Sequence, residues 1–505
     1  MIKHKTTISA YVLVLAAINH VCGQPTPQSP PEPAPSAGFL NDFLRENVPA
    51  MSAWDFGGSA RARYEAKEGF AVQGVAGSMD FRDDGGNQNN EYFMERIRYH
   101  AGFTQKWWNV YAEGQSSLEQ SDERFAYADS PAVPGTIKTK GDGPEADVIM
   151  LRQANVSIGD AKEFPLTFKV GRQELAYGEE RLIGTFGWNN IGRTFDAAKA
   201  HLQTEWVSAD FFTSRPVIPE DGRFNVANDY DWLSGVYATT AKVPKNTLDV
   251  YFFSRNSSAS AIAAEPRPQF PQPSARDIYT IGGRLKSLPG QRGNWDYSLE
   301  GAYQFGDFRD YRLGASSPRL AQSAFMVVAQ AGYTFTNAWG HPRLGAVYSY
   351  GSGDSNPNDG RHGTFDNLFP TNHRLYGIMD FFSLQNIQDL KGTLQIKPVS
   401  SLTLALEGHG FWLADTRDNS YAANGAPRGG VGATPGTGYG INPTYSSFVG
   451  TELDVIASYA ITHCAQLEAG YGHFFVGDYI RQSLSAPDVG SRDANYFYLQ
   501  GNITF

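Results

Sequence analysis

The stretch WDYSLEGAYQF, residues 295–305, places apolar or small side chains at every second position and polar side chains at most positions between them. Successive side chains of a strand point to opposite faces, so this pattern predicts a strand with one apolar and one polar face. The same alternation returns at residues 325–335 and 402–409, and similar segments recur from about Trp54 to Phe505. The sequence therefore predicts an all-β protein built from many two-faced strands.

The connections between these segments alternate in length. Short links fall around Lys106 and at residues 160–165, 205–206, 243–246, 288–293, 337–341, 398–401 and 462–465. Long polar links include residues 68–90, 119–147, 255–276, 351–389 and 415–447. Short periplasmic turns at one end and long extracellular loops at the other are typical of an outer-membrane barrel. We therefore expect a transmembrane antiparallel β-barrel of about 18 strands, each about ten residues long.

Composition and charge agree with a barrel and argue against other classes of protein. Hydrophobic residues make up 41% of the 505 residues, and there is no run of about 20 apolar residues that could form a transmembrane helix. The formal net charge of -10 argues against a nucleic-acid partner, which usually binds a basic face. One chain can pair every strand edge of a closed barrel, so we expect a monomer whose outer face contacts membrane lipid.

The chain divides into three predicted regions. Residues 1–23 hold basic residues and then a short apolar run, which predicts a secretory signal peptide. Residues 24–50 are predicted as a periplasmic linker, whose Pro-rich part, residues 24–37, favours an extended conformation. Residues 51–505 form the predicted barrel, which we expect in the bacterial outer membrane. The apolar face of the last strand ends at Phe505, as in an assembly signal of outer-membrane proteins, although an ordinary edge strand could end in the same way.

In a barrel the polar face lines the lumen, so charged residues on that face are candidates for selectivity. Arg61 and Arg63 alternate with apolar residues in the first segment, and Arg96 and Arg98 do so in the next. Guanidinium groups bind carboxylates through two hydrogen bonds, so this cluster could bind an acidic polysaccharide or a small anion. Acidic residues are expected in the same lumen: Asp196, Asp210, Glu300, Glu407, Asp454 and Glu468. Pairs that only neutralise each other are an equally good interpretation for any single arginine.

Further motifs lie at Leu151-Arg152-Gln153-Ala154, at GRQELAYG, residues 171–178, and at Gly192-Arg193-Thr194-Phe195-Asp196. Together with parts of residues 352–380 and with residues 411–415, they resemble the alginate export family of outer-membrane barrels, over nearly the whole predicted barrel. The resemblance implies export of a polyuronate such as alginate through an arginine-lined constriction, with periplasmic secretion partners and a lid-like loop. It implies substrate-binding roles in the lumen for Arg152, Arg172, Arg181, Arg193 and Asp196.

Two of these arginines conflict with simple alternation, which places Arg152 and Arg172 with apolar residues on the lipid-facing side. A lipid-facing arginine at mid-depth costs about 2 to 4 kcal/mol. We therefore predict one β-bulge before Ala154 and another near Gly171, each of which turns an arginine toward the lumen. Arg181 and Arg193 lie in a long connection. This connection either folds into the lumen as a constriction or covers the lumen from outside.

Other chemistry has weaker support. The oxygen-bearing side chains of residues 354–360 are spaced much as in a calcium loop, but an ordinary Asn-Asp-Gly turn fits the same residues better. No His-Glu-x-x-His group, Gly-x-Ser-x-Gly elbow or phosphate loop occurs, so we expect no enzyme, no metal and no cofactor. Two alternatives to export stay open: an uptake porin for small anions or sugars, and an outer-membrane hydrolase, for which Glu407 and His409 lack a clear third member.

Overall fold

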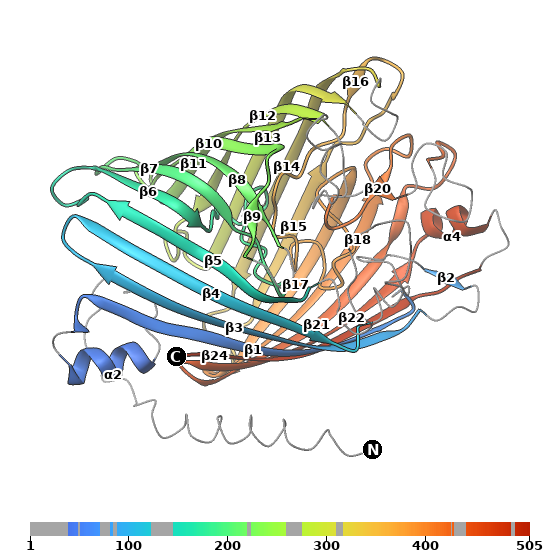
Figure 1. The fold of residues 1–505 in the computed structure, drawn as a ribbon. Coiled ribbons are helices and arrows are strands. Elements are labelled where there is room, and N and C mark those ends of the chain that lie inside the picture. The colour runs from blue at the N-terminus through green and yellow to red at the C-terminus, as the bar shows by residue number, and fades with distance from the viewer. Residues whose placement is uncertain are drawn as a thin grey trace.

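A computed structural model describes residues 39–48, 51–70, 81–83, 88–122, 145–219, 224–258, 275–309, 317–425, 427–428, 441–485 and 490–505. Within this part, 18 strands form one closed antiparallel barrel, and they follow one another around the wall in chain order (Figure 1). The last strand pairs with the first, from Ser59 with Thr504 to Glu68 with Asn495. The predicted barrel is therefore confirmed, and its closure leaves no free edge.

The strands of the wall are β1 (Trp54–Glu68), β3 (Asn90–Thr104), β4 (Trp108–Gln120), β5 (Asp147–Ile158), β6 (Leu166–Gln173), β7 (Phe195–Gln203), β8 (Ser208–Ile218), β10 (Asp231–Thr240), β11 (Asn246–Ser257), β12 (Ala275–Ser287), β13 (Trp295–Arg309), β14 (Leu320–Thr334), β15 (Arg343–Gly351), β17 (Ile387–Val399), β18 (Leu402–Leu413), β21 (Phe448–Thr462), β22 (Ala465–Val476) and β24 (Ala494–Thr504). The short strands outside these are β2 (Arg82–Asp83), β9 (Val226–Ala227), β16 (Arg361–His362), β19 (Ser420–Tyr421), β20 (Pro427–Arg428) and β23 (Gly490–Ser491).

Two described helices, α2 (Phe39–Asn47) and α4 (Asp478–Ser485), lie at opposite ends of the barrel (Figure 1). Neither is long and apolar enough to span a membrane. Helix α2 lies in the second half of the predicted linker, residues 24–50, after its Pro-rich part. The side-chain oxygen of Asn41 accepts a 2.7 Å hydrogen bond from the backbone N–H of Phe56 and so docks α2 against β1. The predicted signal peptide and the proline-rich start of the linker lie outside the described residues.

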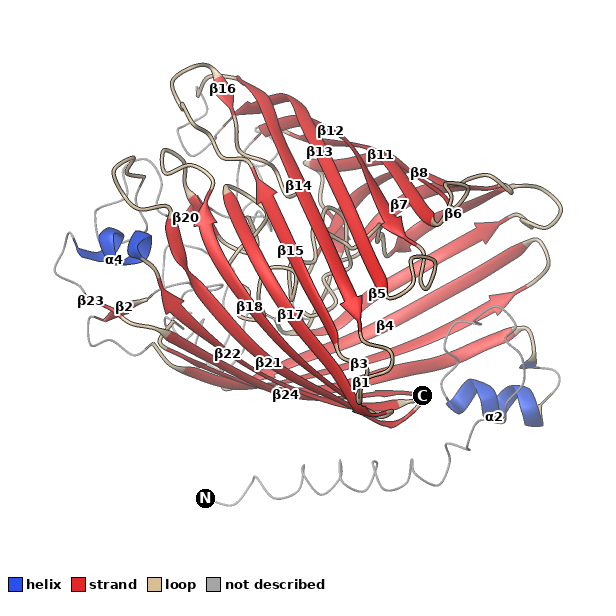
Figure 2. Cartoon of the chain, turned by 180° about the vertical axis from the view of Figure 1, so that it is seen from behind, coloured by secondary structure: helices blue, strands red, loops and turns tan. Residues whose placement is uncertain are grey.

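Loop lengths alternate along the wall as the sequence predicts (Figure 2). The short connections are residues 105–107, 159–165, 204–207, 241–245, 288–294, 335–342, 400–401 and 463–464, and the long connections join the strands at the other end. Both ends of the barrel chain lie on the side of the short turns, because the strand number is even. In the outer membrane this is the periplasmic side.

The outer face of the wall carries an apolar band. Val250, Ile281 and Leu299 each leave more than half of their surface free of protein contacts, with exposed fractions of 51%, 52% and 53%. Tryptophans gather near the short turns, at positions 54, 107, 108, 206, 295 and 339. An apolar band bordered by aromatic residues is the surface that lipid covers. An aromatic girdle is therefore present at the periplasmic rim.

A charge on this band should destabilise the barrel according to its depth. Ile281→Arg, at the centre of β12, should lower the free energy of unfolding by about 2 to 4 kcal/mol, and Phe164→Arg, in a periplasmic turn, by about 0 to 1 kcal/mol. Urea unfolding of both variants in lipid vesicles measures the difference. Equal losses for the two variants would contradict the position of the band.

Candidate functional site

The connection between β6 and β7, residues 174–194, folds into the lumen and is termed the first inner loop. At one point the backbone oxygen of Gly187 accepts a 3.1 Å hydrogen bond from Arg61 of β1. At another point Arg181 forms an ion pair of 3.4 Å with Glu300 of β13. Because β1 and β13 lie far apart around the wall, the loop crosses the lumen. Of the two placements left open by the sequence, the structure shows the constriction.

A second long connection, residues 352–386 between β15 and β17, also crosses the lumen and is termed the second inner loop. Asp366 of this loop forms a 3.0 Å ion pair with Arg255 of β11. Farther along, the backbone N–H of Met379 donates a 2.9 Å hydrogen bond to Glu452 of β21. The loop is therefore anchored on widely separated strands of the wall.

The two inner loops bind each other inside the barrel. Ile183 and Phe369 form a parallel bridge, and Arg193 donates hydrogen bonds to the backbone oxygens of Phe369 at 2.6 Å and Pro370 at 2.9 Å. Burial lowers the pKa of Arg193 to about 9, and the nearby charge of Arg255 adds to this effect. Arg193 thus fastens one loop to the other, and the two loops together form a single constriction.

Aromatic rings pack the constriction against the wall. Tyr177 of the first inner loop stacks on Phe212 and Tyr237, with ring centroids 5.4 and 4.9 Å apart. Trp188 of the same loop stacks on His373 of the second, with centroids 3.6 Å apart. The sequence did not identify Trp188 as a site residue, because nothing local shows that a tryptophan in a long connection is folded inward.

Most of the predicted lumenal arginines are neutralised by carboxylates. Their ion pairs are Arg63 with Glu65 at 2.8 Å, Arg98 with Glu113 at 3.9 Å, Arg152 with Glu113 at 3.3 Å and with Glu174, and Arg181 with Glu179 at 2.9 Å. Arg63 and Arg152 are at most 1% exposed. For these residues the interpretation as charge pairs that stiffen the barrel fits best.

Arg61 and Arg96, like Arg193, bind backbone and amide oxygens and not carboxylates. They face each other across the β1–β3 ladder, and both donate hydrogen bonds to the backbone oxygen of Gly187, at 3.1 and 3.0 Å. The other acceptors of their guanidinium groups are the backbone of Asn189 and the side-chain amide of Asn190. Among the described residues neither arginine has an ion pair with a carboxylate. Two adjacent positive charges are therefore held without a carboxylate in ion-pair contact, although the charge of Glu145 acts on Arg61 from farther away.

These two arginines line a lumenal cavity of about 550 Å³. The other lining residues are Gly178, Glu179, Glu180, Thr185, Gly187, Trp188, Thr371, His373, Leu375, Gln500 and Asn502. Burial alone would raise the pKa of Glu179, but Arg181 and Lys286 outweigh it and the pKa is lowered. Glu180 accepts hydrogen bonds from the backbone of Thr185 and the hydroxyl of Thr371. Glu179 and Glu180 therefore place negative charge in the same cavity, but among the described residues neither forms an ion pair with Arg61 or Arg96.

A bulge explains how Arg152 reaches the lumen. Gln153 pairs with Glu113, but Leu151 pairs with Gly114, so Arg152 is an extra residue in β5. Its guanidinium donates a 2.8 Å hydrogen bond to the backbone oxygen of Ile191 in the first inner loop. The bulge expected before Ala154 is present. It lets the consecutive side chains of Arg152 and Gln153 both point inward.

The expectation that Arg172 and Asp196 line the lumen is corrected by the structure. The ladder of β6 continues through Gly171 without a register shift, although the φ of this glycine is 119°. Arg172 therefore stays on the lipid-facing side with Val170, where it binds Asp196 through hydrogen bonds of 2.7 and 3.0 Å. The backbone oxygen of Asn225 accepts a further bond of 2.8 Å. Arg172 lies at the extracellular end of β6, where Asp196 pairs with its charge and Asn225 covers it. The charge is therefore not exposed to lipid, and the cost of such exposure is removed.

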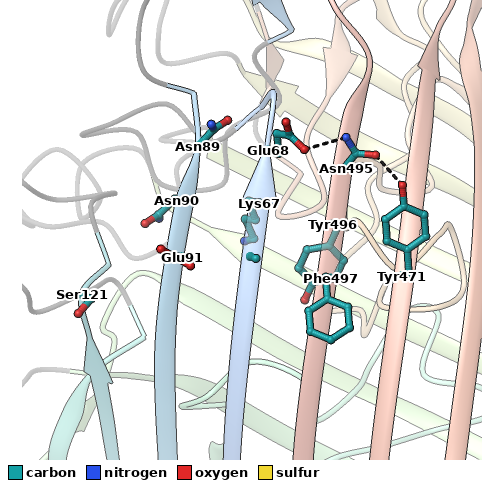
Figure 3. A pocket seen from close by; sticks show the side chains of 11 residues that line it. Lys67, Glu68, Asn89, Asn90, Glu91, Ser121, Tyr471, Asn495, Tyr496 and Phe497 are labelled. Atoms are coloured by element: carbon teal, nitrogen blue, oxygen red, sulfur yellow. Dashed lines mark hydrogen bonds between the residues drawn. The ribbon is translucent and has the colours of Figure 1, made fainter. Parts of the chain in front are cut away.

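A second cavity, of about 780 Å³, lies at the extracellular ends of β1, β3 and β24 (Figure 3). Asn495 bridges part of it, because it donates a 3.0 Å hydrogen bond to Glu68 and accepts a 2.7 Å bond from Tyr471 (Figure 3). Tyr471 is 45% exposed and belongs to the outer face of β22. This cavity is a feature of the rim, not of the lumen.

The segment 354–360 forms an ordinary turn. The side chains of Asp354 and Asn356 accept hydrogen bonds from the backbone N–H groups two residues later, at 3.0 and 3.3 Å, and Asp359 accepts one from Arg361 at 2.9 Å. Such local bonds are the usual reason for Asp and Asn in turns.

Comparison with known proteins agrees with the architecture. A family model described as alginate export matches residues 53–490. OccAB1 of Acinetobacter baumannii is 10% identical, with a TM-score of 0.54 over 90% of this chain and 97% of that chain. OccK7 (OpdD) of Pseudomonas aeruginosa is 11% identical, with a TM-score of 0.53 over 90% and 99%. OccAB4 of Acinetobacter baumannii is 11% identical, with a TM-score of 0.52 over 91% and 100%. These structures share the fold. No curated protein matched the sequence.

Asp366 is expected to hold the second inner loop in place. It forms buried ion pairs with Arg255 and Arg276, so Asp366→Asn leaves buried charges with reduced compensation and should cost about 3 to 5 kcal/mol in loop anchoring. A higher single-channel conductance would report the loosened loop. Asp359→Asn is the control, because Asp359 belongs to the same loop but, among the described residues, its side chain bonds only to the backbone N–H of Arg361. Equal conductance of both variants would contradict the anchoring role.

The ion pairs of Asp366 with Arg255 and Arg276 should persist in mild acid. Burial would raise the pKa of Asp366, but Arg255 and Arg276 outweigh it and lower the pKa to about 2. An acid with a lowered pKa contributes its stabilisation above its unfolded value of about 3.9 and loses it as the pH falls toward the folded value. The anchor should therefore remain at pH 4.5, with the conductance that the channel has at pH 7. A loop that opens between these pH values would contradict this assignment.

Proposed function

This chain belongs to the alginate export family of outer-membrane barrels, and on this premise we propose that it conducts an anionic polysaccharide such as alginate across the outer membrane. The observation that carries the proposal is the pair Arg61 and Arg96, which lines the lumenal cavity without a carboxylate partner among the described residues. A guanidinium group with a free charge attracts carboxylates, and each sugar unit of a polyuronate carries one.

The surroundings of the two arginines suit a sugar acid. The cavity volume of about 550 Å³ lies within the usual range of ligand sites, so it can hold a short stretch of chain. The stacked rings of Trp188 and His373 line the same cavity and supply apolar ring surface beside the charges, although Arg63 also lies over the Trp188 ring. Charge and ring surface together favour an anionic sugar over a simple inorganic ion.

A second candidate is an uptake channel for small anions. The constriction favours it, because the two inner loops are bound to each other and to the wall by buried contacts such as that of Arg193 with Phe369. A polymer needs these loops to shift, whereas a small solute needs only the existing space. The hydrolase alternative has less support, since His409 is only 1% exposed and lies inside the wall. Periplasmic partners and a monomeric state stay predictions.

Planar-bilayer recordings test the proposal. The wild-type channel should be anion-selective and should be blocked by alginate oligomers. The double variant Arg61→Glu/Arg96→Glu should shift selectivity toward cations and raise the blocking concentration at least about tenfold, which corresponds to about 1.4 kcal/mol. Arg292→Glu is the matched control, because Arg292 lies in a periplasmic turn and bonds only to Tyr297 among the described residues.

The outcomes separate the candidates. A cation-selective wild-type channel without block would reject the polyanion proposal. Block by a monomeric uronate that is as strong as block by the oligomers would favour the small-anion channel. An unchanged block in the double variant would place the binding site away from Arg61 and Arg96.

A further inference from the structure

A second group of charged residues lies in the lumenal wall, away from the arginine-lined cavity. It comprises Asp389 of β17, Glu407 and His409 of β18, and Glu452 and Asp454 of β21. In the ladder Glu407 lies opposite Asp454, and His409 lies opposite Glu452. All five residues are at most 8% exposed. The strand register, not the local sequence, brings them together.

The negative charge of this group is only partly balanced. Glu407 forms ion pairs with Lys391 at 3.3 Å and Arg374 at 3.4 Å, on the side of β17 and the second inner loop. Within the described part of the chain, Glu452 and Asp454 form no ion pair with lysine or arginine. The backbone N–H groups of residues 379 and 378 donate hydrogen bonds to them, at 2.9 and 3.4 Å, and the two carboxyl groups also contact each other. Buried carboxylates without a cation are costly, so a positive charge would stabilise the arrangement.

His409 supplies an independent indication of what is missing. Its Nδ1 lies 2.9 Å from a carboxylate oxygen of Asp389, which fixes the ring orientation. Its Nε2 has no hydrogen-bond partner, and it lies 4.0 Å from Oε2 of Glu407. One oxygen of Asp454 likewise has no hydrogen-bond partner. A histidine held by a carboxylate through one nitrogen, with the other nitrogen free, is the usual arrangement of a metal ligand.

We propose that Glu407, His409 and Asp454 bind a divalent metal ion of the zinc type. One ligand atom from each residue lies within 4.8 Å of the others, so a small closing movement brings all three to metal-ligand distance. One imidazole nitrogen and two carboxylate oxygens form a ligand set that suits Zn²⁺. Asp389 acts as a positioning residue that orients His409. Lys391 and Arg374 form ion pairs with Glu407 and not with the other carboxylates of the group. A divalent ion would compensate the negative charge of those other carboxylates.

Such an ion would join β18 to β21 beneath the anchor of the second inner loop. Glu452 and Asp454 receive the backbone hydrogen bonds of Met379 and Ile378 from that loop. Metal binding would therefore stiffen the wall where the constriction is attached. The sequence alone predicts no metal, because the ligands come from two strands, β18 and β21, that are separated by a long connection.

Zinc titration of the tag-free barrel in detergent, after treatment with EDTA, tests this proposal. Calorimetry and metal analysis should show one Zn²⁺ per chain. His409→Gln and Asp454→Asn should abolish this binding, and Asp389→Asn should weaken it by about 10 to 100-fold. His201→Gln is the matched control, because His201 also faces the lumen and lies 2.7 Å from a carboxylate oxygen of Asp210. Its zinc affinity should equal that of the wild type. The heat-dependent shift in gel mobility shows that each variant is folded.

Two results would overturn the proposal. One is a wild-type barrel that binds no more Zn²⁺ than His409→Gln, and the other is equal binding by all variants, which would place the ion elsewhere. If a ligand variant fails to fold, zinc-edge anomalous diffraction from wild-type crystals decides the question. A peak among Glu407, His409 and Asp454 supports the site, and a peak only at other residues rejects it.

Discussion

The closure of β24 on β1 is the constraint on which the rest of the structure depends. In lipid no water can satisfy backbone N–H and C=O groups, so each strand must find a partner on both sides. The pairing from Ser59 with Thr504 to Glu68 with Asn495 completes the ring. The backbone N–H of Phe505 donates to the oxygen of Gly58 at 2.9 Å, which extends this seam to the last residue. Once the ring is closed, every side chain points either to lipid or to the lumen.

The polar interior that follows from closure must itself be satisfied. A wide barrel with many inward arginines and carboxylates would be an open, water-filled channel, but here two inner loops fill much of the space. Their backbone oxygens accept hydrogen bonds from arginines of the wall, as Gly187 does from Arg61 and Arg96. The same contacts hold the loops and keep the two guanidinium groups positioned in the cavity. Structure and proposed selectivity therefore depend on the same residues.

The lumenal site could be predicted only where alternation holds. Arg61 and Arg96 lie in regular strands, so their inward orientation could be inferred from the residues on either side. Arg152 reaches the lumen through an extra residue in β5, and Arg172 stays outside although Gly171 precedes it. A bulge depends on the partner strand as much as on its own sequence. For this reason only one of the two predicted bulges, the one before Ala154, is present. The buried cluster of His409 and Asp454 depends on the register between β18 and β21, for which the sequence carries no local signal.

By itself the sequence determined the class of architecture, because the period of two and the alternating loop lengths are local features that only a membrane barrel combines. It also identified the candidate arginines and, through resemblance, the alginate export family that the match over residues 53–490 confirms. The tertiary structure alone decided which arginines keep an unbalanced charge. Whether a guanidinium group meets a carboxylate such as Glu65 or a carbonyl such as that of Gly187 depends on where distant loops cross the lumen. That crossing is a long-range packing outcome, and no periodic pattern along the chain encodes it.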